Sequence, residues 1–212
     1  MWIKLTDKII EKNELSVKDN RKISEIYVVF GAMENESGSD PLEWQVIEYD
    51  EKNNKALLLS RYLVTEKPYM YVGNYLSEDG ITWAESTIRT YLNDEFYNSA
   101  FTKEEQSLIK KVKIKNKDNK KTKTKGGKNT SDRIFLLSLS EVEKYFEAKS
   151  LESDFDSRVC RFKNGEVNEW WLRSPGLSQD SVSYVYEDGS VRGNYYKGNN
   201  AGVRPAMWIE LQ

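Results

Sequence analysis

The 212-residue sequence contains no histidine and one cysteine, Cys160. Without histidine, Ser-His-Asp and Cys-His catalysis, histidine zinc sites and histidine proton shuttles are excluded. A lone cysteine excludes an intrachain disulfide and leaves too few ligands for a cysteine zinc site. Acid pairs remain, such as Glu187 with Asp188 or Glu169 with Asp180, but adjacent acids in a turn usually serve the turn. We therefore expect no enzyme activity, no cofactor and no metal.

Long hydrophobic runs and an excess of one charge are also missing. No apolar stretch is long enough to span a membrane, and the N-terminus lacks the apolar region of a signal peptide. The net charge of -2 gives no global field for nucleic acid or an anionic membrane. These features predict a cytoplasmic protein with no nucleic-acid partner and no membrane insertion. A fragment of a longer surface protein would have the same features, and the oligomeric state is left open.

Hydrophobic and aromatic residues are plentiful, at 38% and 12% of the chain. One compact domain of this length buries roughly 70% of its unfolded surface. We expect one domain over residues 25–212, preceded by an N-terminal extension over residues 1–24.

Alternating hydrophobicity predicts an antiparallel meander at the start of this domain. A strand is expected from Glu25 to Phe30, ended by Gly31 and followed by an acidic, turn-rich loop over residues 32–41. The segments LEWQVIEYD and KALLLSRYLV then form a hairpin around the turn EKNN.

Three helix starts carry the capping-box pattern, a Ser or Thr followed three residues later by Glu. They lie at Thr82–Glu85, Thr102–Glu105 and Ser140–Glu143. The first two helices should each bury one face. The residues of these two faces are Ile88, Tyr91 and Leu92, and Leu108, Ile109 and Val112.

Lysine dominates the stretch from Lys110 to Asn129, in which Asp118 is the one acid. Such a run could hold phosphates or a polyanion. However, no aromatic residue is interleaved for base stacking, and Gly126-Gly127 is typical of a flexible loop tip. We interpret the stretch as a solvated loop and leave open whether it is ordered.

The C-terminal third predicts strands again. EWWLRS is expected to place Trp170 and Leu172 opposite Trp171 and Arg173, and a hairpin is expected around EDG at residues 187–189. Pro205 cannot donate to a sheet, so the closing strand should lie at an edge or begin after a bulge there. Five large residues of this region are interpreted as a structural scaffold. They are Trp170, Trp171, Arg173, Arg204 and Trp208.

Six sequence blocks, in order, resemble a bacterial family of unknown function over residues 25–211. They are Glu43–Val46, Thr82–Asn93, Ala100–Glu105, Asp132–Ser138, Trp170–Gly176 (WWLRSPG) and Val203–Ile209 (VRPAMWI). The resemblance implies an α+β fold similar to C-type-lectin-like domains and the formylglycine-generating enzyme scaffold. Such a fold has antiparallel sheets, two to three helices and a loop-rich C-terminal half. This chain lacks the calcium-site motifs of true C-type lectins, and Cys160 lacks the second cysteine that formylglycine generation needs.

Tyr, Asn, Ser and Gly gather between residues 177 and 201, a composition typical of binding loops. Our first hypothesis is a non-catalytic module that binds a protein or a glycan there. The candidate ligand-binding residues are Tyr184, Tyr186, Asn194, Tyr195, Tyr196, Asn199 and Asn200. The alternatives are a structural or accessory domain with no specific small ligand, and an enzyme on a formylglycine-generating-like scaffold.

Overall fold

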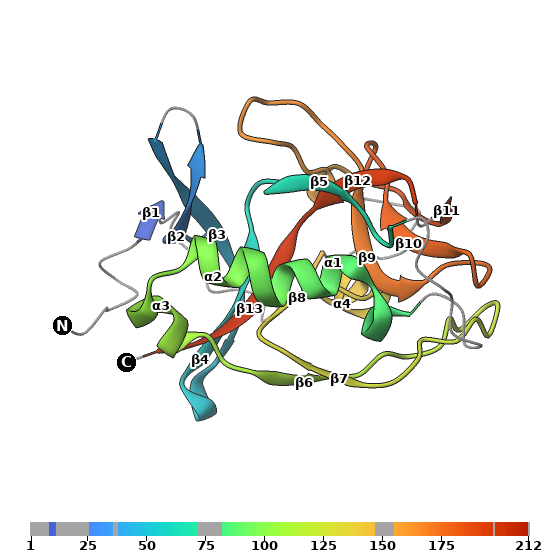
Figure 1. The fold of residues 1–212 in the computed structure, drawn as a ribbon, viewed down its shortest axis with the longest axis horizontal. Coiled ribbons are helices and arrows are strands. Elements are labelled where there is room, and N and C mark those ends of the chain that lie inside the picture. Colours follow the sequence, from blue (N-terminus) through green and yellow to red (C-terminus); the bar gives the residue numbers. More distant parts are fainter. Residues whose placement is uncertain are drawn as a thin grey trace, which may run out of the picture.

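The computed structural model describes residues 9–11, 26–35, 38–71, 82–146, 155–196 and 198–211. Two sheets dominate these residues, a six-stranded sheet in the order β1-β2-β3-β4-β13-β8 and a five-stranded sheet in the order β11-β10-β9-β12-β5 (Figure 1). A pair of short strands and a few helices lie beside them. The fold is therefore α+β, built from mostly antiparallel sheets.

The predicted meander is confirmed by β2 (Tyr27–Asn35), β3 (Gly38–Asp50) and β4 (Lys55–Ser60), which pair in antiparallel order. The turn between β3 and β4 is the short helix η2 (Glu51–Asn53). Most of the predicted N-terminal extension, residues 1–24, lies outside the described residues. Its described part, β1 (Ile9–Glu11), pairs with β2 at the edge of the sheet.

Gly31 does not end its strand, and the predicted loop over residues 32–41 is wrong. Strand β2 continues to Asn35, and the register shifts between Val29 and Ala32. Gly31 has a φ of 76°, and its N–H donates to Oε1 of Glu105 at 3.1 Å. The glycine thus forms an irregularity inside a long hairpin, because its backbone turns toward a helix instead of toward solvent.

The second sheet contains β5 (Thr65–Pro68), β9 (Trp170–Pro175), β10 (Ser181–Val185), β11 (Val191–Tyr196) and β12 (Asn200–Val203). Strands β10 and β11 confirm the hairpin predicted around residues 187–189. Strand β12 pairs with β9 in parallel, whereas the other pairings in this sheet are antiparallel.

The chain passes from the second sheet to the first at Arg204. Strand β13 (Pro205–Glu210) lies between β4 and β8 (Ile134–Leu136), so the predicted edge position is wrong. Pro205 is the first residue of β13, where a missing N–H is tolerated even inside a sheet. Arg204 holds the junction by donating from Nε to the carbonyl of Ser60 at 3.0 Å.

Helices cluster between the meander and the second sheet. After η3 (Trp83–Glu85), the elements α1 (Thr87–Tyr91), η4 (Leu92–Phe96) and α2 (Tyr97–Ala100) follow without a break. The helix α3 (Lys103–Leu108) follows, and α4 (Leu139–Tyr145) comes later in the chain. The short helix η5 (Phe155–Arg158) precedes β9. No helix among these residues is long and apolar enough to cross a membrane.

Of the three predicted capping boxes, the one at Thr102 is confirmed with Glu105. The helix predicted from Thr82 starts later, because the side chain of Ser86 caps α1. The box predicted at Ser140 belongs to Ser138, which pairs with Glu141. The register of each cap is decided by which hydroxyl reaches the free N–H groups, and neighbouring serines fit the same sequence pattern.

Four tryptophans of the core are fully buried, and each of their indole N–H groups has a carbonyl or carboxylate partner, as buried tryptophan requires. Trp44 donates to the carbonyl of Phe30 at 2.7 Å and Trp170 to that of Arg158 at 3.0 Å. Trp171 donates to the carbonyl of Lys67 at 2.9 Å. The two tryptophans of WWLRSPG are fully buried, and so are both faces of β9 at this point.

The lysine-rich stretch over residues 110–129, here called the lysine arm, follows α3. The second predicted helix face is partly wrong, since α3 ends at Leu108 and Val112 begins a strand. That strand, β6 (Val112–Ile114), pairs with β7 (Thr130–Asp132), and the arm extends between them toward the second sheet (Figure 1).

Candidate functional site

Asn119 anchors the lysine arm to the proline-glycine turn of WWLRSPG. Its Nδ2 donates to the carbonyls of Pro175 at 3.2 Å and Gly176 at 3.0 Å. Its Oδ1 accepts from the backbone N–H groups of Lys121 and Thr122. Asn119 is buried, although it stands among exposed lysines. The middle of the arm is therefore held against β9 and is more than a solvated loop.

Gly126 and Gly127 pack closely and do not form an exposed tip. A Cβ at Gly126 would lie 2.4 Å from the carbonyl oxygen of Lys117, and one at Gly127 would lie 2.5 Å from the side chain of Thr82. In β7, just after the arm, Asp132 accepts a hydrogen bond from the indole N–H of Trp83 at 2.8 Å. Only glycine fits where two stretches of backbone approach this closely.

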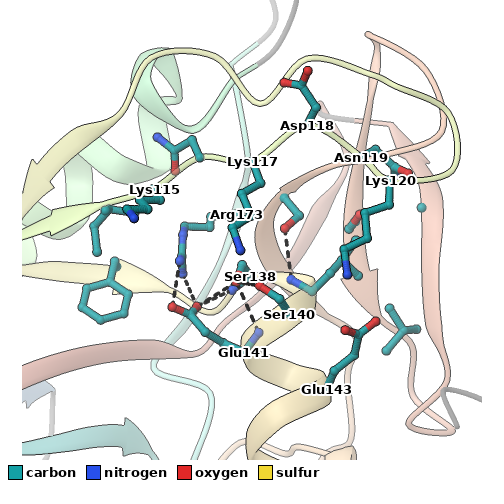
Figure 2. Close-up of a pocket in the computed structure, with 18 of the residues that line it drawn as sticks. Lys115, Lys117, Asp118, Asn119, Lys120, Ser138, Ser140, Glu141, Glu143 and Arg173 are labelled. Carbon is teal, nitrogen blue, oxygen red and sulfur yellow. Dashed lines mark hydrogen bonds and ion pairs between the residues drawn. The ribbon is translucent and has the colours of Figure 1, made fainter.

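A cavity of about 740 Å³ lies beneath the lysine arm. Its walls are residues 112–121 of the arm, the start of α4 at residues 138–143, the end of β9, and residues 177 and 191–193 of the second sheet. Figure 2 shows the arm crossing above the first turn of α4. This volume falls in the range of roughly 300 to 1,000 Å³ that is typical of small-molecule sites.

The charge in this lysine cavity is strongly positive and largely uncompensated. Eight cationic and three acidic side chains line it. Five of the lysines form no ion pair with a described residue, and they are Lys113, Lys115, Lys117, Lys120 and Lys121. Lys117 and Lys120 project from the arm toward the first turn of α4, whereas Asp118 points away from it (Figure 2). Asp118 is paired with Lys125 outside the cavity.

The floor of the cavity contains the ion pair of Arg173 and Glu141. Arg173 Nη2 donates to Glu141 Oε1 at 2.8 Å, and Nη1 donates to the other carboxylate oxygen and to the carbonyl of Leu136. Arg173 is only 6% exposed, and its Nε has no hydrogen-bond partner among the described residues. One donor of a buried guanidinium is therefore left over beside the cavity.

Glu141 also caps α4, because its Oε2 accepts from the N–H of Ser138 at 2.7 Å. Burial acts to raise the pKa of Glu141. The charge and hydrogen bonds of Arg173 and the bonds from Ser138 outweigh burial, so the pKa lies below its ordinary value. Glu141 consequently stays ionised at neutral pH and neutralises Arg173. The net positive charge of the cavity then comes from the lysines.

The predicted tyrosine surface is mostly packed inward. Tyr184 is buried, with its ring 4.7 Å from that of Tyr195 and 6.4 Å from that of Tyr186. Tyr195 lies against Trp171 at 5.2 Å, and its hydroxyl donates to Oε1 of Glu169 at 2.5 Å. These residues form one aromatic cluster with tilted and edge-to-face contacts.

The other predicted ligand residues lie outside this cluster. Tyr196 is 47% exposed, and Asn194, Asn199 and Asn200 are exposed as well. Tyr186 is half-buried beneath the guanidinium of Arg192, 3.7 Å from its ring. The lysine cavity shares residues 177, 183 and 191–193 with the predicted segment, and none of the seven predicted ligand residues lines it.

The remaining scaffold residues lie around the two sheets. Arg204 is buried with its guanidinium 5.0 Å from the ring of Trp170. Trp208 is half-buried and lines the cavity. The ammonium of Lys55 lies 4.4 Å from the centroid of its ring. Sequence reasoning did not identify Lys117 and Lys120 as site residues. The one signal available was Asn119, a residue able to anchor a loop, within the run of lysines.

Comparison with protein families gives a match over most of the chain. The family model described as a domain of unknown function, DUF6273, matches residues 53–211 of the chain. No curated protein and no solved structure matches the chain. The matched range contains the lysine arm, both walls of the cavity and the whole second sheet.

Proposed function

The chain belongs to the DUF6273 family of domains of unknown function, and we propose that it is a non-catalytic binding module whose lysine cavity holds an anionic ligand. The observation that carries this proposal is a set of five lysines around one cavity that form no ion pair with any residue the structure describes. Ammonium groups so close together repel one another, and an anion in their midst relieves that repulsion. Each ammonium at about 4 Å from an anionic group contributes between roughly 1 kcal/mol in water and about 4 kcal/mol near a protein surface.

The chemistry of the lining supports binding over catalysis. Glu141 is committed to Arg173 and Ser138 with a lowered pKa, so it is a poor proton acceptor at neutral pH. Efficient general acids and bases have pKa values near the working pH. The absence of histidine from the chain removes the residue that most often meets this requirement.

A C-type-lectin-like relationship is the finer proposal about the fold. Its support is that the loops of residues 177–201 are displayed on a base made by β9, β12 and β13, which carry the WWLRSPG and VRPAMWI blocks. A protein or glycan partner on the exposed residues Asn194, Tyr196 and Asn199 is the second candidate function. The exposed fraction of Tyr196, 47%, is the observation that favours it.

The test compares two double variants of the lysine arm that remove the same charge. The cavity variant carries Lys117→Gln and Lys120→Gln. The control variant carries Lys123→Gln and Lys128→Gln, which change exposed lysines of the same arm that do not line the cavity. Both variants are screened beside the unmodified protein against an array of neutral and anionic glycans and peptides, after circular dichroism confirms their folding.

We expect anionic members of the array to bind the unmodified protein and the control variant but not the cavity variant. Neutral binders that both variants retain would move the site to the exposed loop residues. Absence of any binder would favour the structural or accessory alternative.

A further inference from the structure

The cavity presents hydrogen-bond donors from opposite walls. Lys117 and Lys120 project from the arm toward Ser138 and Ser140 at the start of α4 (Figure 2). From below, Arg173 contributes positive charge, and its guanidinium is buried against Glu141. Among the described residues, the hydroxyl of Ser140 has one hydrogen-bond partner, the hydroxyl of Ser138 at 3.2 Å. A ligand in this space would meet two ammonium groups above it and serine hydroxyls below it.

The shape of the anionic group follows from this arrangement. A carboxylate is planar and offers its two oxygens in one plane, whereas phosphate and sulfate groups point three terminal oxygens in different directions. Donors on opposite walls match the second shape better, since each wall can reach its own oxygen. Lysine acts as a point charge for phosphate and imposes no planar geometry on it.

Apolar side chains cover part of the far wall of the cavity. Leu177 lines it and is 53% exposed, which is high for a leucine, and Leu139 and Val191 line the cavity as well. An exposed leucine beside a cationic pocket provides a surface for the organic part of a ligand. The volume of about 740 Å³ suits such a molecule.

We propose that the ligand of the lysine cavity is a small phosphate or sulfate ester. Its tetrahedral group lies between Lys117 and Lys120 of the arm and Ser140 of α4, and its organic group packs against Leu177. This inference rests on the proposed function, because it names the class of anion that the same cavity takes.

The experiment is isothermal titration of the full chain with phenyl phosphate, phenyl sulfate and benzoate, which share one aromatic ring and differ in the anionic group. The cavity variant and the control variant are titrated in parallel at the same low salt concentration. A third variant, Leu177→Ser, is titrated with phenyl phosphate and with inorganic phosphate.

We expect at least one of the two esters to bind with an affinity at least about tenfold higher than that of benzoate. A difference of this size fits one extra charge-assisted contact. The cavity variant should lose about tenfold or more in affinity, and the control variant should change by about twofold or less. Leu177→Ser should weaken phenyl phosphate more than inorganic phosphate. The stronger of the two esters identifies the source of the tetrahedral group.

Three results overturn the inference in distinguishable ways. Benzoate binding as tightly as the esters, with loss in the cavity variant, refutes the ester class but leaves the anion-binding function in place. Equal losses in the cavity and control variants show attraction by the charge of the arm alone and refute both proposals. Absence of binding by all three probes refutes the ester class, and the array screen then decides the function separately.

Discussion

Glu141→Ala should be among the most destabilising single changes in this chain outside the tryptophan core. The change removes the bidentate partner of Arg173, which is only 6% exposed, and the acceptor for the N–H of Ser138 at the start of α4. Breaking a buried pair from one side costs about 3 to 5 kcal/mol because it leaves an uncompensated charge. Loss of a cap costs about 1 kcal/mol.

The side chain of Glu141 is 27% exposed, so water takes over part of its role and the lower end of the range applies. We expect the free energy of unfolding to fall by about 4 kcal/mol in total. Urea denaturation followed by tryptophan fluorescence measures this loss. Glu143→Ala is the matched control, since it removes an exposed acid from the same helix and should change stability by less than about 0.5 kcal/mol.

The loss should also depend on pH in a defined direction. Because the folded state holds the pKa of Glu141 below its ordinary value of 4.5, the ionised carboxylate stabilises the fold fully above that value. This stabilisation disappears as the pH falls through the lower, folded pKa. The difference between the unmodified protein and Glu141→Ala should therefore be constant from neutrality down to about pH 5 and narrow below it. A loss under about 1 kcal/mol at neutral pH, or a difference that grows with acid, would refute the role assigned to this ion pair.

Two other regions give predictions of their own. Asn119→Ala removes the bonds to the carbonyls of the Pro175-Gly176 turn, so the lysine arm should be cleaved by trypsin about tenfold faster, while an unchanged cleavage rate would mean that other contacts hold the arm. Gly31→Ala should cost about 3 kcal/mol in urea denaturation, because φ is 76° and the new Cβ would lie 2.6 Å from the carbonyl oxygen of Ala100. Gly38→Ala is the control, because a Cβ there would have nothing within 4 Å, and it should cost only about 1 kcal/mol. Equal losses at both glycines would mean that backbone strain, and not the contact with Ala100, sets the cost at Gly31.

Local patterns in the sequence predicted much of the fold, and they failed where a distant partner decides. The meander and the hairpin at residues 187–189 follow from alternation and turn residues that lie within a few positions of each other. The sequence predicts a strand end at Gly31, but glycine marks both strand ends and bulges. The choice between the two is made by Glu105, which lies 74 positions away and accepts the N–H of Gly31. No window along the sequence contains both residues.

The lysine cavity was hidden for the same reason. The alternation of Val112, Lys113, Ile114 and Lys115 is a readable strand signal, and its burial follows that alternation, with Ile114 inside and both lysines exposed. Composition alone nevertheless made the whole run look solvated, since a lysine contributes the same charge whether it faces open water or a wall.

What turns the run into one side of a cavity is the bond from Asn119 to Gly176, across 57 positions of sequence. The segment WWLRSPG is thus a foundation in two senses. Its tryptophans fill the core, and its final turn holds the arm above Arg173. A ligand in the cavity would contact the lysine arm and the end of β9 at once. Binding should therefore hold the arm more tightly against β9 and protect it from trypsin.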